Sequence, residues 1–171
     1  MIIIFDFDGT LFNTLPVYFD IKRNRISSQR DVLFWHKQFI NRRRASLGEY
    51  AEEWKFLFKR CDGQQIYIIS ESPHQVLIFY LDTFGLKPYV SGLFGQQLSQ
   101  DGSRYRTIEK LLLTRKLAWL ISDNPLDLLL RYTTLNIIDA RGFYSGGISV
   151  FRQKLVNLEK TIFGNCTAVS V

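Results

Sequence analysis

The chain has 171 residues, of which 46% are apolar and 15% aromatic, and it carries a formal net charge of +6. This length and apolar content predict one domain with a sizeable core and exclude an intrinsically disordered protein. The apolar runs are too short to span a membrane and the first residues lack the basic segment of a signal peptide, so we expect no membrane association. The two cysteines are too few for a disulfide framework, which favours a reducing cytoplasm.

The first predicted strand covers residues 2–6 and runs into the acidic segment Asp6-Phe7-Asp8-Gly9-Thr10. It is short, apolar and rich in β-branched residues, as is typical of a buried strand in a parallel sheet. Alternation along the strand puts Asp6 and Asp8 on the same side, and Gly9 lets the backbone approach a ligand closely. Two neighbouring carboxylates repel each other, and a hard cation such as Mg²⁺ between them offsets this cost. The simpler alternative is an acidic loop that caps a strand.

This first strand and its acidic end closely resemble the first motif of the haloacid dehalogenase (HAD) superfamily of phosphohydrolases, over Ile3-Ile4-Phe5-Asp6-Phe7-Asp8-Gly9-Thr10-Leu11-Phe12-Asn13-Thr14. The resemblance implies that Asp6 is the nucleophile, that Asp8 is the general acid/base, and that both contribute to a Mg²⁺ site. In such chemistry a carboxylate attacks phosphorus and forms an aspartyl-phosphate, while the second acid protonates the leaving oxygen. Dehalogenases usually lack the second acid, so Asp8 argues against dehalogenation.

Two helices are predicted after the first strand, over residues 30–43 and 47–60, each with one apolar stripe. In HAD proteins a cap module can enter here, but at least one helix must cross back to the next strand. Residues 15–60 therefore hold a minimal helical cap, an extension, or no cap. Residues 22–44 are strongly basic and include Arg42-Arg43-Arg44 near the predicted turn. Such a patch attracts anionic substrates, although a solvated helix face would have the same composition.

The second predicted strand covers residues 66–70 and is followed by a helix over 73–84. Ser72-Pro73 between them is typical of a helix N-cap followed by proline at the first helical position. The segment resembles the second HAD motif, which implies that Ser70 holds a phosphate oxygen beside the N–H groups of the helix N-terminus. Taken alone, a serine after a strand is more simply a plain N-cap.

A strand over residues 89–94 and a helix over 105–115 come next. Near the start of this helix HAD proteins carry a basic residue, usually lysine, that steadies the charge of the nucleophile and the phosphate. No lysine stands there, and the candidates for phosphate binding are Arg104, Arg106 and Lys110. Arginine supplies the charge without the point-like geometry of lysine. For each of the three, a solvated position on the helix is an equal alternative.

The fourth strand, over residues 117–122, ends in front of Asp123 and resembles the fourth HAD motif. The resemblance implies that Asp123 completes the Mg²⁺ shell and that Asp127, one helical turn later, orients the metal or its waters. Ser122 stands where the family often has glycine. A helix start is the simpler alternative for this segment. The remaining predicted elements are a helix over 125–131, a strand over 135–139 and a helix over 149–162.

Alternating strands and helices predict an α/β chain, a single HAD-like domain over residues 1–171 with a Rossmann-like, three-layer fold and a mostly parallel sheet. The candidate acids follow strands, and open α/β sheets bind ligands at the carboxyl ends of their strands. We therefore expect a Mg²⁺-dependent phosphomonoester hydrolase acting on a small phosphorylated substrate, with nucleotides or other polyanionic phosphates favoured. The alternative is a low-turnover or non-catalytic protein on the HAD scaffold that binds nucleic acid or another anionic partner.

Overall fold

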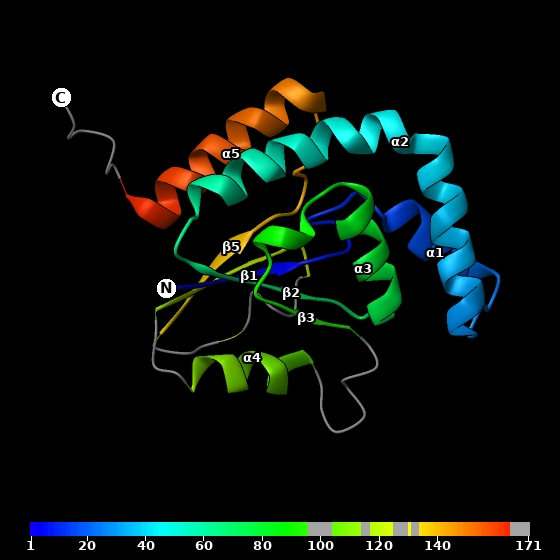
Figure 1. The fold of residues 1–171 in the computed structure, drawn as a ribbon, viewed down its shortest axis with the longest axis horizontal. Coiled ribbons are helices and arrows are strands. Elements are labelled where there is room, and N and C mark those ends of the chain that lie inside the picture. The colour runs from blue at the N-terminus through cyan, green and yellow to red at the C-terminus, as the bar shows by residue number, and fades with distance from the viewer. Residues whose placement is uncertain (96–103, 114–116, 125–129, 131–133, 165–171) are drawn as a thin grey trace.

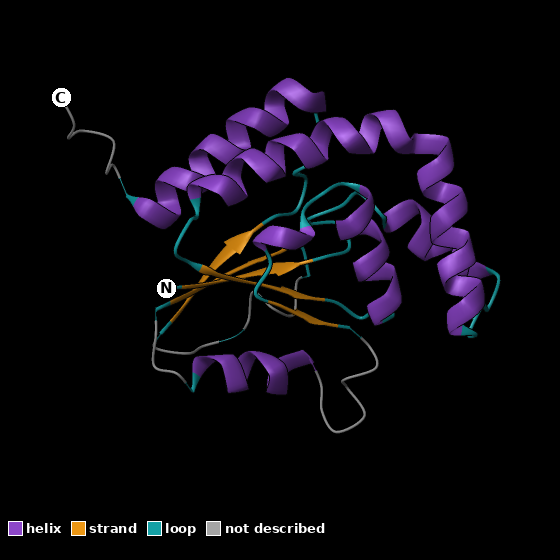
Figure 2. Ribbon diagram, in the orientation of Figure 1, coloured by secondary structure: helices purple, strands orange, loops and turns teal. Residues whose placement is uncertain are grey.

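The computed structural model describes residues 1–95, 104–113, 117–124, 130 and 134–164, with the side chains of Arg104 and Tyr105 left out. Five strands form one sheet in which every neighbouring pair is parallel, in the order β3-β2-β1-β4-β5. Helices cover both faces of this sheet (Figures 1 and 2). The expected three-layer α/β architecture is therefore confirmed. The strands are β1 Ile2–Asp6, β2 Gln65–Ile69, β3 Gly92–Phe94, β4 Ala118–Ser122 and β5 Leu135–Asp139.

Two helices, α1 and α2, follow β1, and α3, α4 and α5 follow β2, β3 and β5. Helix α4 lies on the opposite face of the sheet from α2, α3 and α5 (Figure 1). Their bounds are α1 Leu15–Arg23, α2 Gln29–Arg60, α3 His74–Thr83, α4 Arg104–Leu112 and α5 Gly147–Phe163, with a short 3₁₀ helix, η1, over Lys87–Tyr89. Among the described residues, no helix has both the length and the apolar character that a membrane crossing requires.

Strand β1 lies at the centre of the sheet and is buried along its whole length. Ile3 and Phe5 belong to the core on the side of α2, α3 and α5, whereas Ile2 and Ile4 pack with Ile108 of α4. Because both faces of the strand are covered, apolar residues occupy successive positions without the alternation of a half-exposed strand.

Residues 15–60 agree with the sequence prediction at one point and differ from it at another. The helices predicted over 30–43 and 47–60 are the two halves of α2, which meet at a kink at the non-helical residue Arg43 (φ −125°, ψ 15°). The break beside Arg42–Arg44 was therefore predicted correctly, and the residues between the two predicted helices are themselves helical. Helix α1 was not predicted, since only Val17 and Ile21 form its buried stripe.

The two halves of α2 have different neighbours. The second half packs along α5 (Figure 1), where Glu53 pairs with Arg152 and Arg60 pairs with Glu159. The first half packs against α1 and α3. Residues 15–60 therefore contain both the crossover helix to β2 and a helical extension formed by α1 and the first half of α2.

Two further predictions concern single elements, one strand and one helix. The strand predicted over 89–94 begins only at Gly92, because Pro88 lies in the first turn of η1 and that turn extends to Tyr89. The helix predicted over 125–131 lies, apart from Leu130, outside the described residues.

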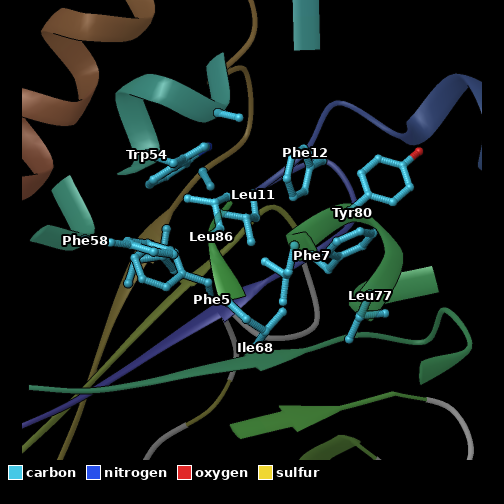
Figure 3. Close-up of a cluster of buried hydrophobic side chains, with 14 of the residues drawn as sticks. Phe5, Phe7, Leu11, Phe12, Trp54, Phe58, Ile68, Leu77, Tyr80 and Leu86 are labelled. Carbon is cyan, nitrogen blue, oxygen red and sulfur yellow. The ribbon is translucent and has the colours of Figure 1, made fainter. Parts of the chain in front are cut away.

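Aromatic side chains fill the core beneath the loop that follows β1 (Figure 3). The ring of Phe5 meets that of Trp54 edge to face at 5.3 Å between centroids, and Phe7 meets Tyr80 in the same way at 5.2 Å. Phe12 contacts both of these rings, at 5.0 Å from Tyr80 and 5.4 Å from Phe7 between centroids. The acidic segment is therefore anchored by buried rings on both sides of Asp8, which limits the movement of its backbone.

Candidate active site

The carboxyl ends of β1, β2 and β4 lie side by side. They form the carboxyl edge of the sheet, where the parallel strands end. In the parallel register Asp6 is opposite Ile69 of β2, and Phe5 is opposite Ile121 of β4. Ser70 and Ser122 each follow these partner residues by one position. The predicted strand-end residues are thus brought to the same edge, at a strand spacing of about 4.8 Å.

Asp6 is the most enclosed of the candidate acids, with 6% of its surface exposed. Its Oδ1 accepts a hydrogen bond from the backbone N–H of Phe7 at 2.7 Å, and its Oδ2 accepts one from Ser122 Oγ at 3.2 Å. Ser122 Oγ also accepts from the N–H of Asn124 at 3.1 Å. The serine that replaces the usual glycine therefore orients the predicted nucleophile, a contact that the sequence did not indicate.

Asp8 is held by three hydroxyl groups. Thr14 Oγ1 donates to its Oδ1 at 2.6 Å, while Ser70 Oγ and Ser72 Oγ donate to its Oδ2 at 2.9 and 2.7 Å. Ser70 Oγ also accepts from the N–H of Ser72 at 2.8 Å. A hydroxyl carries one hydrogen, so Ser70 has to turn it away from Asp8 before donating to a phosphate oxygen. Phosphate binding by Ser70 stays a prediction.

Asp123 is joined to the first motif through Thr10. Thr10 Oγ1 donates to Asp123 Oδ1 at 2.9 Å and accepts from the N–H of Asp123 at 2.9 Å. Gly9, at φ +77°, lies so close that an added Cβ would be 2.2 Å from Asp123 Oδ2. Both the backbone conformation and this approach exclude a side chain at position 9. Gly9 thus allows the loop to lie against Asp123, and its close approach to a ligand stays a prediction.

The donor chemistry of this edge fits a magnesium ion. Two carboxylates, those of Asp6 and Asp123, come from neighbouring strands, and the backbone carbonyl of Asp8 is the third predicted ligand. Within the part of the chain that the structure describes, no three His, Cys, Asp or Glu side chains gather as a metal-binding group. Mg²⁺ does not require such a group, because it commonly retains several waters and uses one or two carboxylates.

The predicted basic residues lie on or near α4. Arg106 and Lys110 are exposed, and each stands two positions from a residue, Ile108 or Leu112, that is buried against the strands. Two positions correspond to about 200° around a helix, so both basic residues are on the face away from the sheet. The side chain of Arg104, the first residue of α4, and Asp127 lie outside the described residues. Their roles stay predictions.

Tyr144, from the segment between β5 and α5, supports the first motif from beneath. Its hydroxyl lies 2.5 Å and 3.1 Å from the carbonyl oxygens of Leu11 and Thr10, to which it donates. Trp54 Nε1 donates to the same hydroxyl at 3.3 Å. Burial raises the pKa of Tyr144, so the phenol stays protonated and can donate. The sequence offered no signal for this residue beyond a single tyrosine in a glycine-rich segment.

His36 and Tyr80 form a buried polar pair near Asp8. The Nδ1 atom of His36 lies 3.1 Å from the hydroxyl of Tyr80, and His36 is 1% exposed. Burial lowers the pKa of His36, and the charge of Asp8 opposes that shift. The pair therefore links α2 to α3 beneath the acidic segment.

Comparison of the chain with protein-family models finds no match, and comparison with curated proteins finds none. The functional interpretation therefore depends on the motifs and on the contacts at the edge of the sheet. These contacts join Asp6 to Ser122, Asp8 to Ser70 and Asp123 to Thr10.

Proposed function

We propose that the protein is a Mg²⁺-dependent phosphomonoester hydrolase of the HAD type that works through an aspartyl-phosphate on Asp6. The observation that carries this proposal is the hydrogen-bonded convergence of three strand ends. Ser122 bonds Asp6 across 116 positions of sequence, and Ser70 bonds Asp8 across 62. Acids oriented in this way at the carboxyl edge of a parallel sheet support phosphoryl chemistry better than a structural acidic loop would.

In the first half of the reaction, a carboxylate oxygen of Asp6 attacks the phosphorus of the ester. The phosphorus–oxygen bond to the leaving group breaks, and Asp8 gives a proton to the departing oxygen. In the second half, Asp8 takes a proton from water, and the resulting hydroxide attacks the phosphorus of the aspartyl-phosphate. The phosphorus–oxygen bond to Asp6 breaks, which releases phosphate and restores the Asp6 carboxylate. The fixed orientation of Asp6 by Phe7 and Ser122 supports in-line attack, because the nucleophile needs little reorganisation.

The groups that would hold Mg²⁺ are the carboxylates of Asp6 and Asp123 and the backbone carbonyl of Asp8. Bound there, the cation offsets the combined negative charge of nucleophile and phosphate. Thr10 keeps the Asp123 carboxylate against the first motif through its paired hydrogen bonds. The side chain of Asp8 accepts hydrogen bonds from three hydroxyl groups. The proposal therefore assigns this side chain to proton transfer and not to the metal.

A low-turnover binding protein on the same scaffold is the second candidate. Its specific support is the absence of lysine at the start of α4 together with the basic residues of 22–44. Such a protein would bind phosphate compounds or nucleic acid without consuming them.

The deciding experiment is a phosphatase assay on a panel of phosphorylated metabolites, with Mg²⁺ and with EDTA. We expect Mg²⁺-dependent release of phosphate from at least one of them. The Asp6→Asn variant should abolish it, because an amide cannot form the acyl phosphate. The matched control is Asp62→Asn, which alters an exposed acid beyond the end of α2 and should retain full activity. Phosphate release that Asp6→Asn leaves intact would refute the mechanism, and no release from any compound would favour the binding protein.

A further inference from the structure

A groove of about 310 Å³ lies between α1 and the first half of α2. This volume is at the lower end of the range for small-molecule sites, about 300–1,000 Å³. Its lining combines an apolar wall with a few polar side chains, which is the usual composition of such sites. None of the predicted site acids lines the groove, so it is a feature separate from the candidate active site.

Aromatic residues of α2 form one wall of the groove, namely Phe34, Trp35 and Phe39. Phe34 is 57% exposed, although α2 buries other apolar residues in the same turns. An aromatic ring left in water at the wall of a groove offers a flat surface on which a planar ring can stack. Stacking of a base on such a side chain contributes about 1–3 kcal/mol.

Polar and charged side chains complete the lining. Arg42 and Arg43 stand at the bend of α2, and the guanidinium of Arg43 lies 6.0 Å from the ring centre of Phe39. Asp20 of α1 and Gln38 of α2 add hydrogen-bond acceptors and donors of the kind that read the edge of a base. The two arginines favour a ligand that carries negative charge as well as a planar ring.

The groove begins close to the candidate active site along the chain. Pro16 and Val17, which line it from α1, follow Thr14 by two and three positions, and Thr14 donates to Asp8. On the α2 side Trp35 precedes His36, whose partner Tyr80 belongs to the core beneath Asp8. The groove is therefore lined by residues that follow, within three positions of the chain, a residue bonded to Asp8.

We propose that this groove binds the base of a nucleotide whose phosphate lies at Asp6 and Asp8. The inference rests on the proposed phosphatase function for the position of the phosphate, and it names nucleoside monophosphates as the substrate class. Aromatic stacking, two cations and a pair of hydrogen-bonding side chains in one groove match the ring, the charge and the polar edge of such a ligand.

Binding separates this inference from turnover. We would titrate the Asp6→Asn protein, with Mg²⁺, with AMP, GMP, CMP and UMP and with glycerol 3-phosphate as the probe that lacks a base. At least one nucleotide should bind about tenfold more tightly than glycerol 3-phosphate. Phe34→Ala should weaken nucleotide binding at least about fivefold, from the lower stacking value, and leave glycerol 3-phosphate unchanged. The control is Phe56→Ala, a 61% exposed phenylalanine in the second half of α2, which should change neither.

A second pair of variants tests the charged end of the groove. Arg42→Ala should weaken nucleotide binding more than Arg44→Ala, because Arg44 is an exposed neighbour outside the groove.

Equal binding of nucleotides and glycerol 3-phosphate, or equal effects of the paired variants, would overturn the base site and leave the phosphatase proposal standing. If the wild-type protein binds nucleotides but releases phosphate from none of them, the phosphatase proposal is refuted and the base site in the groove stands. A single-stranded oligonucleotide that binds more tightly than every mononucleotide, and with a steep salt dependence, would identify nucleic acid, and not a mononucleotide, as the ligand of the groove.

Discussion

At the scale of single residues, Asp6 and Asp8 are held by donors of different kinds. Asp6 receives a backbone N–H and one hydroxyl, whereas Asp8 receives three hydroxyls. A backbone N–H can only donate, but a hydroxyl can turn and accept. The hydroxyls around Asp8 can therefore reorient, whereas the backbone N–H of Phe7 fixes one oxygen of Asp6. The two acids thus differ in the way proposed for a proton carrier and a fixed nucleophile.

The corresponding prediction is for Asp8→Asn. The amide keeps the size of the side chain but cannot transfer a proton, so kcat should fall by about a hundredfold or more while substrate binding persists. Steady-state kinetics together with a binding titration would measure both quantities. Asp82→Asn, an exposed acid of α3 paired with Lys87, is the control and should keep the wild-type rate. A kcat near the wild-type value in Asp8→Asn would remove Asp8 from the mechanism.

At the scale of elements, the loop after β1 is stabilised by parts of the chain that are distant in sequence. Tyr144, 133 positions after Leu11, donates to its carbonyl oxygen, and Trp54 of α2 donates to Tyr144. Thr10, in the same loop, bonds Asp123 after β4. The loop that carries Asp8 is thus fixed by α2, β4 and the segment before α5 together.

Tyr144→Phe should therefore loosen this loop. The change leaves the carbonyl of Leu11 and the indole of Trp54 without their shared partner, which costs about 1–3 kcal/mol of unfolding free energy. Urea denaturation would measure this loss, and kcat should decrease with it because the loop carries Asp8. The control is Tyr50→Phe, whose ring packs against Tyr144 at 5.0 Å and which should change stability by less than about 0.5 kcal/mol. A loss in Tyr144→Phe no larger than that in Tyr50→Phe would show that the hydrogen bonds of the Tyr144 hydroxyl do not stabilise the loop.

At the scale of the whole molecule, α2 connects the helical extension to the core. Its first half holds His36 against Tyr80 of α3, and its second half packs along α5. Burial lowers the pKa of His36 below its ordinary value of 6.5 and raises that of Tyr80. A buried neutral histidine at this junction makes the stability of the fold depend on pH.

The sign of this dependence follows from the direction of the shift. In the unfolded chain His36 gains a proton near its ordinary pKa of 6.5, whereas the folded protein keeps it neutral to lower pH. The unfolded state therefore binds more protons, and the free energy of unfolding should decrease as the pH falls below about 6.5. Denaturant titrations between about pH 8 and pH 5 would measure the slope for the wild type.

The His36→Gln variant should be less stable at neutral pH but should show a smaller decrease between about pH 7 and pH 5. An unchanged slope in His36→Gln would assign the pH dependence to other groups, such as the carboxylates.

Local sequence determined most of the secondary structure and the composition of the candidate site. The short apolar runs marked the strands, and β1 and β5 begin and end where they were predicted. Asp6, Ser70 and Asp123 were recognised because each stands where an apolar run stops, which is a property of adjacent residues. The break in α2 was predicted at its place, beside Arg43, whereas the short helix α1 was missed, since its thin apolar stripe carries little local signal.

The tertiary structure alone decided which polar groups pair. The sequence showed Ser122 only as a residue that stands where HAD proteins often have glycine, but parallel pairing of β1 with β4 places its hydroxyl on Asp6. Ser72 and Thr14 meet at Asp8, and Tyr144 reaches the loop from the far end of the chain. The groove between α1 and α2 arises in the same way, from the packing of two helices. Hydrogen-bond partners and cavities depend on register and helix packing between distant segments, and the order of neighbouring residues does not specify these.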